Sequence, residues 1–192
     1  MTSTVLVLAS ASPRRAELLR SAGIPFEVVV ADVDERQLAD EDADTYVRRL
    51  ARDKAAKVAA RCPGRAVLGA DTAVVLDGEV LGKPRDVPDA IAMLSRLSGR
   101  GHRVLTGVCL IDPSGHPETA VASTLVEFRA LSAAEIAQYV ASGEPMDKAG
   151  AYGIQAGARG FIARIEGDHD TVVGLPVALV QAMCRAGRIQ VS

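Results

Sequence analysis

The stretch that decides the fold is Ala66-Val67-Leu68-Gly69-Ala70-Asp71-Thr72-Ala73-Val74-Val75-Leu76. An apolar run of this kind is typical of a strand that is buried on both faces of a sheet. The pair Asp77-Gly78 follows and predicts a tight hairpin turn into a short strand at 79–81. Asp71 interrupts the run, and a buried carboxylate is costly unless a cation or a metal pairs with it or a turn lifts it out. Gly69 and Ala70 leave room for a group to approach, so Asp71 is either functional or a structural residue at a bend.

Strands and helices follow one another on both sides of this run without strict alternation. We expect strands at 4–9, 26–30, 104–111, 119–129 and 161–165, and helices from 13 to about 23 and at 44–61, 87–97, 132–142 and 175–186. Residues 32–44, with seven acids and one arginine, and residues 143–160, with five glycines, are expected to be loops. This order indicates an α/β fold with a mixed β-sheet and flanking helices, in one domain spanning 1–192.

The composition excludes several classes of function. The 192 residues are 48% hydrophobic and 24% charged, which is typical of a globular protein and not of a disordered one. A net charge of −2, with only 3% aromatic residues, argues against nucleic-acid partners, which require a basic surface or stacking side chains. No apolar run is long enough for a membrane span. Cys62, Cys109 and Cys184 are too scattered for a disulfide framework or a zinc site, and predict reduced thiols in the cytoplasm.

Four cations and two acids stand out as candidate site residues. Arg14 and Arg15 follow Ser12-Pro13 in the first turn of a predicted helix, where free N–H groups suit a phosphate. Lys54 shares the apolar face of the 44–61 helix, so it either reaches a cleft or snorkels to water, whereas Arg48, Arg49, Arg52 and Lys57 are expected on a solvated face.

Lys83, which Pro84 forces into an extended conformation, and the acids Glu35 and Asp71 complete the candidates. Small residues around Tyr152 would let backbone N–H groups approach a ligand, unless that segment is a mobile surface loop. Together these residues suit a polyphosphate and a divalent cation, although the chain lacks a P-loop and a Gly-x-Ser-x-Gly motif.

Several short motifs resemble, in order along nearly the whole chain, those of the Maf family of nucleoside triphosphate pyrophosphatases. They are Leu8-Ala9-Ser10-Ala11-Ser12-Pro13-Arg14-Arg15, Gly69-Ala70-Asp71-Thr72, Gly82-Lys83-Pro84-Arg85-Asp86, Ser98-Gly99 with His102, Thr106-Gly107-Val108 and Asp147-Lys148-Ala149-Gly150-Ala151-Tyr152-Gly153-Ile154-Gln155. The resemblance implies an elongated mixed-sheet fold with two lobes around a deep cleft, similar to inosine triphosphatase. It also implies a cytoplasmic enzyme that uses Mg²⁺ or Mn²⁺ and is commonly a homodimer. The charge, the few aromatic residues and the lack of a long apolar run predict no nucleic-acid or membrane partner.

The resemblance further implies a role for each matching residue. Asp71 is the proposed proton acceptor and, with Glu35, a metal-site residue. Ser10, Arg15, Lys54 and Lys83 are associated with phosphate, and Arg14, Thr72 and Gln155 with selection of dTTP and UTP. Ala156 replaces the glycine that usually follows the glutamine, and Gly167-Asp168-His169-Asp170 departs from the aromatic residues often found there. The alternatives are a pyrophosphatase for other or modified nucleotides such as 7-methyl-GTP, a phosphatase that releases orthophosphate, and a nucleotide-binding regulator of cell division without turnover.

Overall fold

The computed structural model describes residues 5–155 and 157–191 and divides into two compact units. Unit 1 contains the described parts of Met1–Asp71, Thr106–Ala122 and Gly174–Ser192, and unit 2 contains those of Thr72–Leu105 and Ser123–Val173. The strands belong to one sheet of order β2-β1-β3-β5-β6-β7, in which β4 also pairs with β3. Parallel and antiparallel pairs both occur, which confirms the predicted mixed sheet. None of the described helices has the length and apolar character that crossing a membrane requires.

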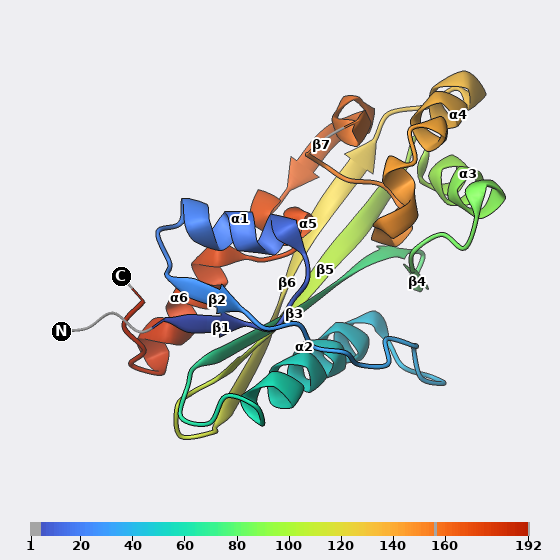
Figure 1. Cartoon of the computed structure of the whole chain (residues 1–192). Helices are drawn as coiled ribbons and strands as arrows, with labels where there is room; N and C mark the ends of the chain where they lie inside the picture. The colour runs from blue at the N-terminus through green and yellow to red at the C-terminus, as the bar shows by residue number, and fades with distance from the viewer. Residues whose placement is uncertain (1–4, 156, 192) are drawn as a thin grey trace. The chain divides into compact units, whose positions relative to one another are not determined.

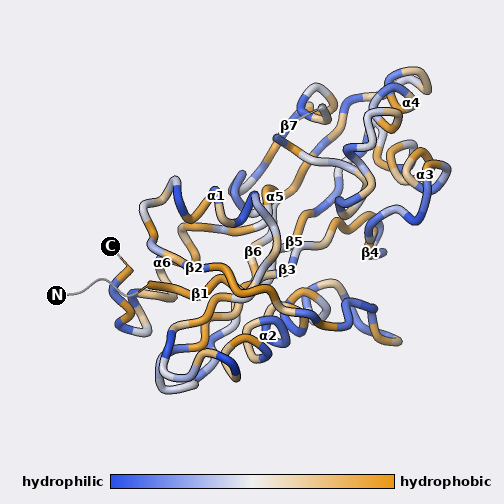
Figure 2. The backbone as a smooth tube through the Cα atoms, viewed as in Figure 1, coloured by the Kyte–Doolittle hydropathy of each residue, from blue (hydrophilic) through white to orange (hydrophobic). Residues whose placement is uncertain are grey.

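Unit 1 is a three-layered arrangement with helices on both faces of parallel strands (Figure 1). Its elements are β1 (Leu6–Leu8), α1 (Pro13–Ser21), β2 (Phe26–Val28), α2 (Ala43–Ala59), the first half of β3 (Val67–Leu76) and α6 (Val177–Ala186). Leu6 and Leu68 pack with residues of α1 and α6, whereas Val7 and Val67 pack with the apolar side of α2. Burial on both faces explains why β1 is continuously apolar and why β3 is apolar at most of its positions, a hydrophobic character that Figure 2 shows along the backbone.

Unit 2 packs helices against antiparallel strands. Its elements are β4 (Glu79–Leu81), α3 (Val87–Leu97), α4 (Ala133–Ala141), the 3₁₀ helices η1 (Glu144–Asp147), η2 (Ala149–Ala151) and η3 (Gly157–Phe161), β7 (Ile162–Glu166) and α5 (His169–Val173). The long strands β5 (Gly101–Ile111) and β6 (Pro117–Phe128), like β3, contribute residues to both units. Asp77 and Gly78 have φ angles of 53° and 84°, the left-handed conformation that the predicted hairpin turn requires.

Most of the predicted helices and strands are confirmed, and the differences lie at their ends and in helices too short to show a hydrophobic periodicity. Helix α3 has the predicted bounds, while β5 begins at Gly101, three residues before the predicted strand. The segment 143–160 contains three 3₁₀ helices rather than loop alone, because such short helices leave no periodicity in the sequence. Helix α5 is missing from the prediction for the same reason, and the Asp168 carboxylate caps it by accepting from the backbone N–H of Thr171 at 3.2 Å. Residue 4 of the first predicted strand lies outside the described residues.

Candidate active site

Helix α2 lies directly against the sheet at two glycines on neighbouring strands. A Cβ atom added to Gly69 on β3 would lie 2.2 Å from the carbonyl oxygen of Ala51, and one added to Gly107 on β5 would lie 2.4 Å from that of Val47. No side chain fits at either position unless the helix moves away. The space that the sequence predicts beside Gly69 is therefore occupied by the protein's own helix.

The close contact between α2 and β3 at Gly69 also brings Lys54 and Asp71 together. Asp71 lies two residues after Gly69 on β3, and Lys54 lies one helical turn after Ala51 on α2. Alternation along a strand places Asp71 on the same face as Gly69, and Lys54 follows Ala51 by three residues on the same side of α2. Lys54 Nζ donates to Asp71 Oδ1 at 2.6 Å, and the two residues are only 7% and 8% exposed. Lys54 therefore does not snorkel to water, and the carboxylate that interrupts the buried strand has the cationic partner that burial demands.

Glu35 brings a second carboxylate to the same ammonium group. It lies in the loop between β2 and α2, and its Oε1 is 2.6 Å from Lys54 Nζ. The Glu35 side chain is 45% exposed and that of Asp71 is 11% exposed, so Lys54 links a solvent-facing acid to a buried one. The structure thus brings together three of the predicted site residues.

The two carboxylates fit a divalent cation of the Mg²⁺ type. Such ions prefer hard oxygen donors and are usually held by one or two carboxylates together with phosphate oxygens of the substrate. Among the residues that the structure describes, no group of three or more His, Cys, Asp or Glu side chains is placed so that it could hold a metal ion. Glu35 and Asp71 would therefore supply two of the oxygen ligands of such an ion, and water or phosphate oxygens would supply the others.

Arg15 is held at the start of α1 by groups within unit 1. Its Nε donates to the carbonyl oxygen of Gly174 at 2.7 Å, and its Nη1 donates to Ser10 Oγ at 3.1 Å. Burial lowers the pKa of Arg15, and the negative charges of Asp71 and Glu35 oppose that shift. The structure therefore places Ser10 and Arg15 together, in the electrostatic field of the two acids. Arg14, one residue earlier, is half-buried.

The predicted cap of this helix differs in detail. Ser12 is the N-cap residue and Pro13 follows it as predicted, but the Ser12 side chain makes no capping hydrogen bond. Instead the backbone N–H of Ser12 donates to Ser10 Oγ at 3.2 Å. The first turn contains no acidic residue, so the helix dipole there faces only the basic side chains.

Unit 2 carries the remaining predicted site residues. Thr72, on β3, is half-buried, whereas Lys83 and Gln155 are exposed loop residues. The backbone N–H of Gly150 donates to the carbonyl oxygen of Gly82 at 3.0 Å, which joins the motif that contains Lys83 to the one that ends at Gln155.

The backbone on both sides of Gln155 is tied to two side chains. Tyr139 Oη accepts from the N–H of Gly153 at 3.1 Å, and Glu144 Oε2 accepts from that of Gly157 at 3.0 Å. Tyr139 also donates to Glu144 Oε1 at 3.0 Å. Gln155 is therefore carried by a braced segment rather than by a mobile loop; Ala156, the departure from the family pattern, lies outside the described residues.

Gly150 and Tyr152 pack within unit 2. A Cβ atom on Gly150 would lie 2.9 Å from the side chain of Val74, and Tyr152 itself is buried. Its hydroxyl lies 2.8 Å from His102 Nε2, and the Tyr152 ring stands edge-on to that of Phe128, 4.8 Å between centroids. Tyr152 and its neighbour Ala151 are thus part of the core of unit 2, while Gln155 at the end of the motif is exposed.

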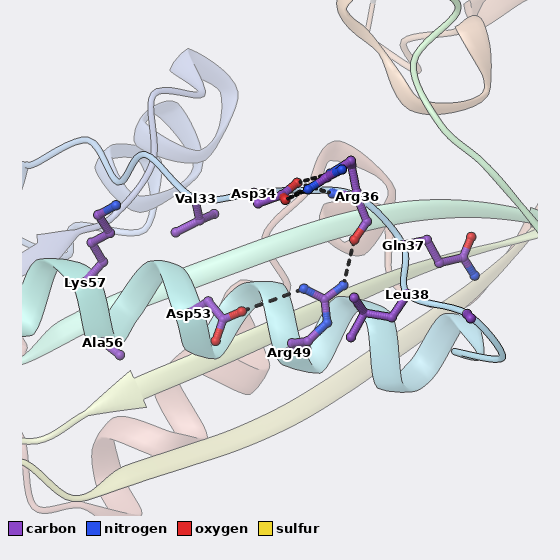
Figure 3. Close-up of a pocket in the computed structure, with 10 residues that line it drawn as sticks. Val33, Asp34, Arg36, Gln37, Leu38, Arg49, Asp53, Ala56 and Lys57 are labelled. Atoms are coloured by element: carbon purple, nitrogen blue, oxygen red, sulfur yellow. Dashed lines mark hydrogen bonds and ion pairs between the residues drawn. The ribbon is translucent and has the colours of Figure 1, made fainter.

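A hollow of about 700 Å³ lies beside the loop that carries Glu35 (Figure 3). Asp34, Arg36, Arg49, Asp53 and Lys57 are among its lining residues, but Glu35, Lys54 and Asp71 are not. Adjacent residues of an extended segment point in opposite directions. Asp34 and Arg36 therefore face this open hollow, while Glu35 turns to Lys54, and the hollow is separate from the candidate site.

The solvated face predicted for Arg48, Arg49, Arg52 and Lys57 is confirmed for three of them, which are exposed, whereas Arg49 is half-buried. Its side chain is 23% exposed and binds the Glu41 carboxylate, which is 4% exposed, at 2.6 Å. Arg48 is exposed as predicted and pairs with Asp44.

Tyr46 is a residue that sequence reasoning does not single out, yet its hydroxyl donates to the carbonyl oxygen of Glu35 at 2.9 Å. Its place eight residues before Lys54, on the same side of α2, is the signal that could have revealed it.

The described site combines a buried lysine with two carboxylates in a mixed-sheet fold, and comparisons with known proteins identify the family. The chain matches the Maf-like protein family over residues 5–186 and belongs to it. It is 56% identical over 185 residues to a dTTP/UTP pyrophosphatase of Myxococcus xanthus, covering 96% of this chain and 93% of that protein. It is 57% identical over 173 residues to a dTTP/UTP pyrophosphatase of Symbiobacterium thermophilum, covering 90% and 88%.

Solved structures support the fold. The Staphylococcus aureus Ham1 protein aligns with a TM-score of 0.53 at 14% identity, covering 95% of this chain and 99% of that one. A HAM1 protein from Coxiella burnetii aligns with a TM-score of 0.51 at 14% identity and the same coverage. The mixed-sheet α/β fold is therefore confirmed, and it is shared with these Ham1 proteins.

Proposed function

We propose that this protein is a nucleoside triphosphate pyrophosphatase that hydrolyses dTTP and UTP to the monophosphate and pyrophosphate. The observation that carries the proposal is the buried Lys54, which holds Asp71 and Glu35 at 2.6 Å each. Relatives that share more than half of their residues with this chain bear the name of this activity. Two carboxylates and a lysine suit a metal-bound triphosphate, since phosphoryl transfer depends mainly on positioning and on stabilising charge.

In the proposed reaction, water attacks the α-phosphorus in line and pyrophosphate leaves. Asp71 orients the water and accepts its proton, and Glu35 completes the metal site. A bound Mg²⁺ or Mn²⁺ would supply Lewis-acid stabilisation of the phosphate oxygens. Lys54 remains beside both acids and offsets charge as it develops on the phosphates. Ser10, Arg15 and Lys83 are proposed to bind phosphate oxygens by hydrogen bonds and charge.

Base selection is assigned to Arg14, Thr72 and Gln155. The Gln155 amide carries one donor group and one acceptor, which match the edge that uracil and thymine share. A polar pocket rejects other bases strongly, because a wrong base leaves buried polar groups unpaired. The braced segment on which Gln155 lies supports this role, since a specificity residue must be held in place.

The remaining proposals concern organisation and location. We propose that 1–192 acts as a single Maf domain, because β3, β5 and β6 run through both units. The protein is proposed to act in the cytoplasm as a homodimer, without nucleic-acid or membrane partners.

The test is to incubate the purified protein with Mg²⁺ or Mn²⁺ and dTTP, UTP, CTP, 7-methyl-GTP, ATP or GTP, and to identify the products. Monophosphate and pyrophosphate from dTTP and UTP are expected. Orthophosphate would indicate a phosphatase, another preferred nucleotide would overturn the base assignment, and saturable binding without turnover would indicate a regulator.

Two variants test the residue roles. Asp71→Asn should abolish turnover without unfolding the protein, whereas Asp77→Asn, at the exposed hairpin turn, should retain activity because asparagine tolerates the left-handed conformation there. Substantial activity in Asp71→Asn would exclude Asp71 from catalysis. Gln155→Ala should change the nucleotide preference, and an unchanged preference would exclude Gln155 from base selection.

A further inference from the structure

We infer that Tyr46 and Arg49 are positioning residues, which keep the Glu35 carboxylate at Lys54 by binding the backbone of the loop that carries it. The inference deepens the proposed function and rests on it, because Glu35 acquires its role as a metal-site residue there. Neither side chain is proposed to touch the metal or the nucleotide.

The loop that carries Glu35 to Lys54 has no regular secondary structure to hold its backbone. No helix or strand is formed between β2, which ends at Val28, and α2, which begins at Ala43. Glu35 is exposed, and the pair that it forms with Lys54 has one half-exposed member. Ion pairs that are open to solvent contribute little, because water screens them and two long side chains must be ordered. Contacts to the loop backbone therefore add to what the pair with Lys54 contributes at the exposed carboxylate.

Helix α2 supplies that support at two consecutive carbonyl groups. Tyr46 Oη donates to the carbonyl oxygen of Glu35 at 2.9 Å, and Arg49 Nη2 donates to that of Arg36 at 3.0 Å. Tyr46 and Arg49 are three residues apart on the helix, and the Arg49 guanidinium lies 5.7 Å from the centre of the Tyr46 ring. The two donors therefore form one unit, which Figure 3 shows in part where Arg49 reaches the backbone of Arg36.

Arg49 is itself fixed by the far end of the same loop. Its Nε and Nη2 bind the two carboxylate oxygens of Glu41 at 2.6 and 2.8 Å. Glu41 Oε2 also accepts from the backbone N–H of Leu38 at 3.0 Å, and Gln37 Nε2 donates to the Glu41 carbonyl oxygen at 2.7 Å. A bidentate arginine of this kind orients both partners, so the loop is tied to α2 on both sides of Leu38.

The electrostatic surroundings of Tyr46 agree with this geometry. Burial and the negative charges of Asp71 and Glu35 raise the pKa of Tyr46 to about 12. A carbonyl oxygen can only accept, so the hydroxyl is the donor in its contact with Glu35.

The test measures Mn²⁺ binding directly, by the electron paramagnetic resonance of free Mn²⁺, alongside turnover of dTTP at saturating nucleotide. Tyr46→Phe keeps the ring and removes only the hydroxyl, so we expect Mn²⁺ affinity to fall roughly two- to tenfold, the effect of one hydrogen bond. Turnover should recover when Mn²⁺ is raised in proportion. Arg49→Gln should weaken Mn²⁺ binding more than Tyr46→Phe does. Arg48→Gln makes the same change at a neighbouring exposed position and should bind Mn²⁺ with wild-type affinity.

A double variant separates positioning from a general structural effect. If Tyr46 acts through Glu35, then adding Tyr46→Phe to Glu35→Gln should leave Mn²⁺ affinity unchanged, because the carboxylate to be positioned is already gone. An equal loss in both backgrounds, a Tyr46→Phe variant with wild-type affinity, or a wild-type protein that does not bind Mn²⁺ would overturn the inference. Wild-type Mn²⁺ binding that depends on Tyr46, without hydrolysis of dTTP or UTP, would overturn the proposed substrates and leave the inference intact.

Discussion

Replacing Gly69 by alanine tests whether the close contact between α2 and β3 builds the candidate site. The added Cβ would lie 2.2 Å from the carbonyl oxygen of Ala51, 2.8 Å from the backbone nitrogen of Ala55 and 2.9 Å from its Cβ. All three are buried atoms of the helix, so no flexible side-chain end can move aside. To restore an ordinary contact of 3.4 Å to the Ala51 oxygen, α2 must retreat by about 1.2 Å.

The movement of α2 should lower both the free energy of unfolding and the rate of hydrolysis, and the two effects can be measured independently. Inserting a methyl group into a packed core costs about 1–3 kcal/mol, and for a chain of this size each kcal/mol lowers Tm by about 2–4 °C. Lys54 moves with the helix, so its 2.6 Å contact with Asp71 lengthens beyond hydrogen-bond distance. A misplacement of about 1 Å in a catalytic arrangement can lower the rate about 100-fold.

The assay is thermal unfolding by circular dichroism together with kcat for dTTP, measured at a temperature where the variant is fully folded. Gly101→Ala is the matched control, since Gly101 also lies on a strand and its added Cβ meets only the Leu125 side chain at 3.6 Å. Wild-type Tm and kcat in Gly69→Ala would refute the reasoning. A lowered Tm with unchanged kcat would retain the packing argument and refute the claim that this contact sets the position of Lys54.

Two further predictions concern unit 2. Burial lowers the pKa of His102 to about 4, whereas the pKa of this side chain in the unfolded chain is about 6.5. Between these two pH values the unfolded chain binds a proton that the folded protein does not bind. The folded protein therefore loses stability as the pH falls from about 6.5 to 4. The wild type should lose about 3 kcal/mol more free energy of unfolding over that range than His102→Gln in urea titrations, and parallel curves would contradict the assignment. Glu144→Ala removes both carboxylate acceptors, so the segment with Gln155 should loosen and KM for UTP should rise several-fold with a smaller change in kcat; an unchanged KM would show that the bracing does not matter for binding.

The sequence by itself determined the class of fold and the residues worth testing. The continuous apolar run at 66–76, the Asp77-Gly78 turn and the capped helices act locally, through periodicity and backbone preference, so they can be read from neighbouring residues. Asp71 and Lys54 stood out because charge on an apolar face is costly. The resemblance to the Maf family then added roles that no local pattern supplies.

Only the tertiary structure decided how those residues are used. It showed that the space beside Gly69 belongs to α2, that Lys54 contacts both Asp71 and Glu35, and that Arg49 is tied to Glu41 and to the loop backbone. These contacts join residues from separate elements, and their partners are fixed by how a helix packs on a strand and how a loop crosses it. The cost of a buried charge can be read from the sequence, whereas the partner that offsets this cost depends on three-dimensional packing.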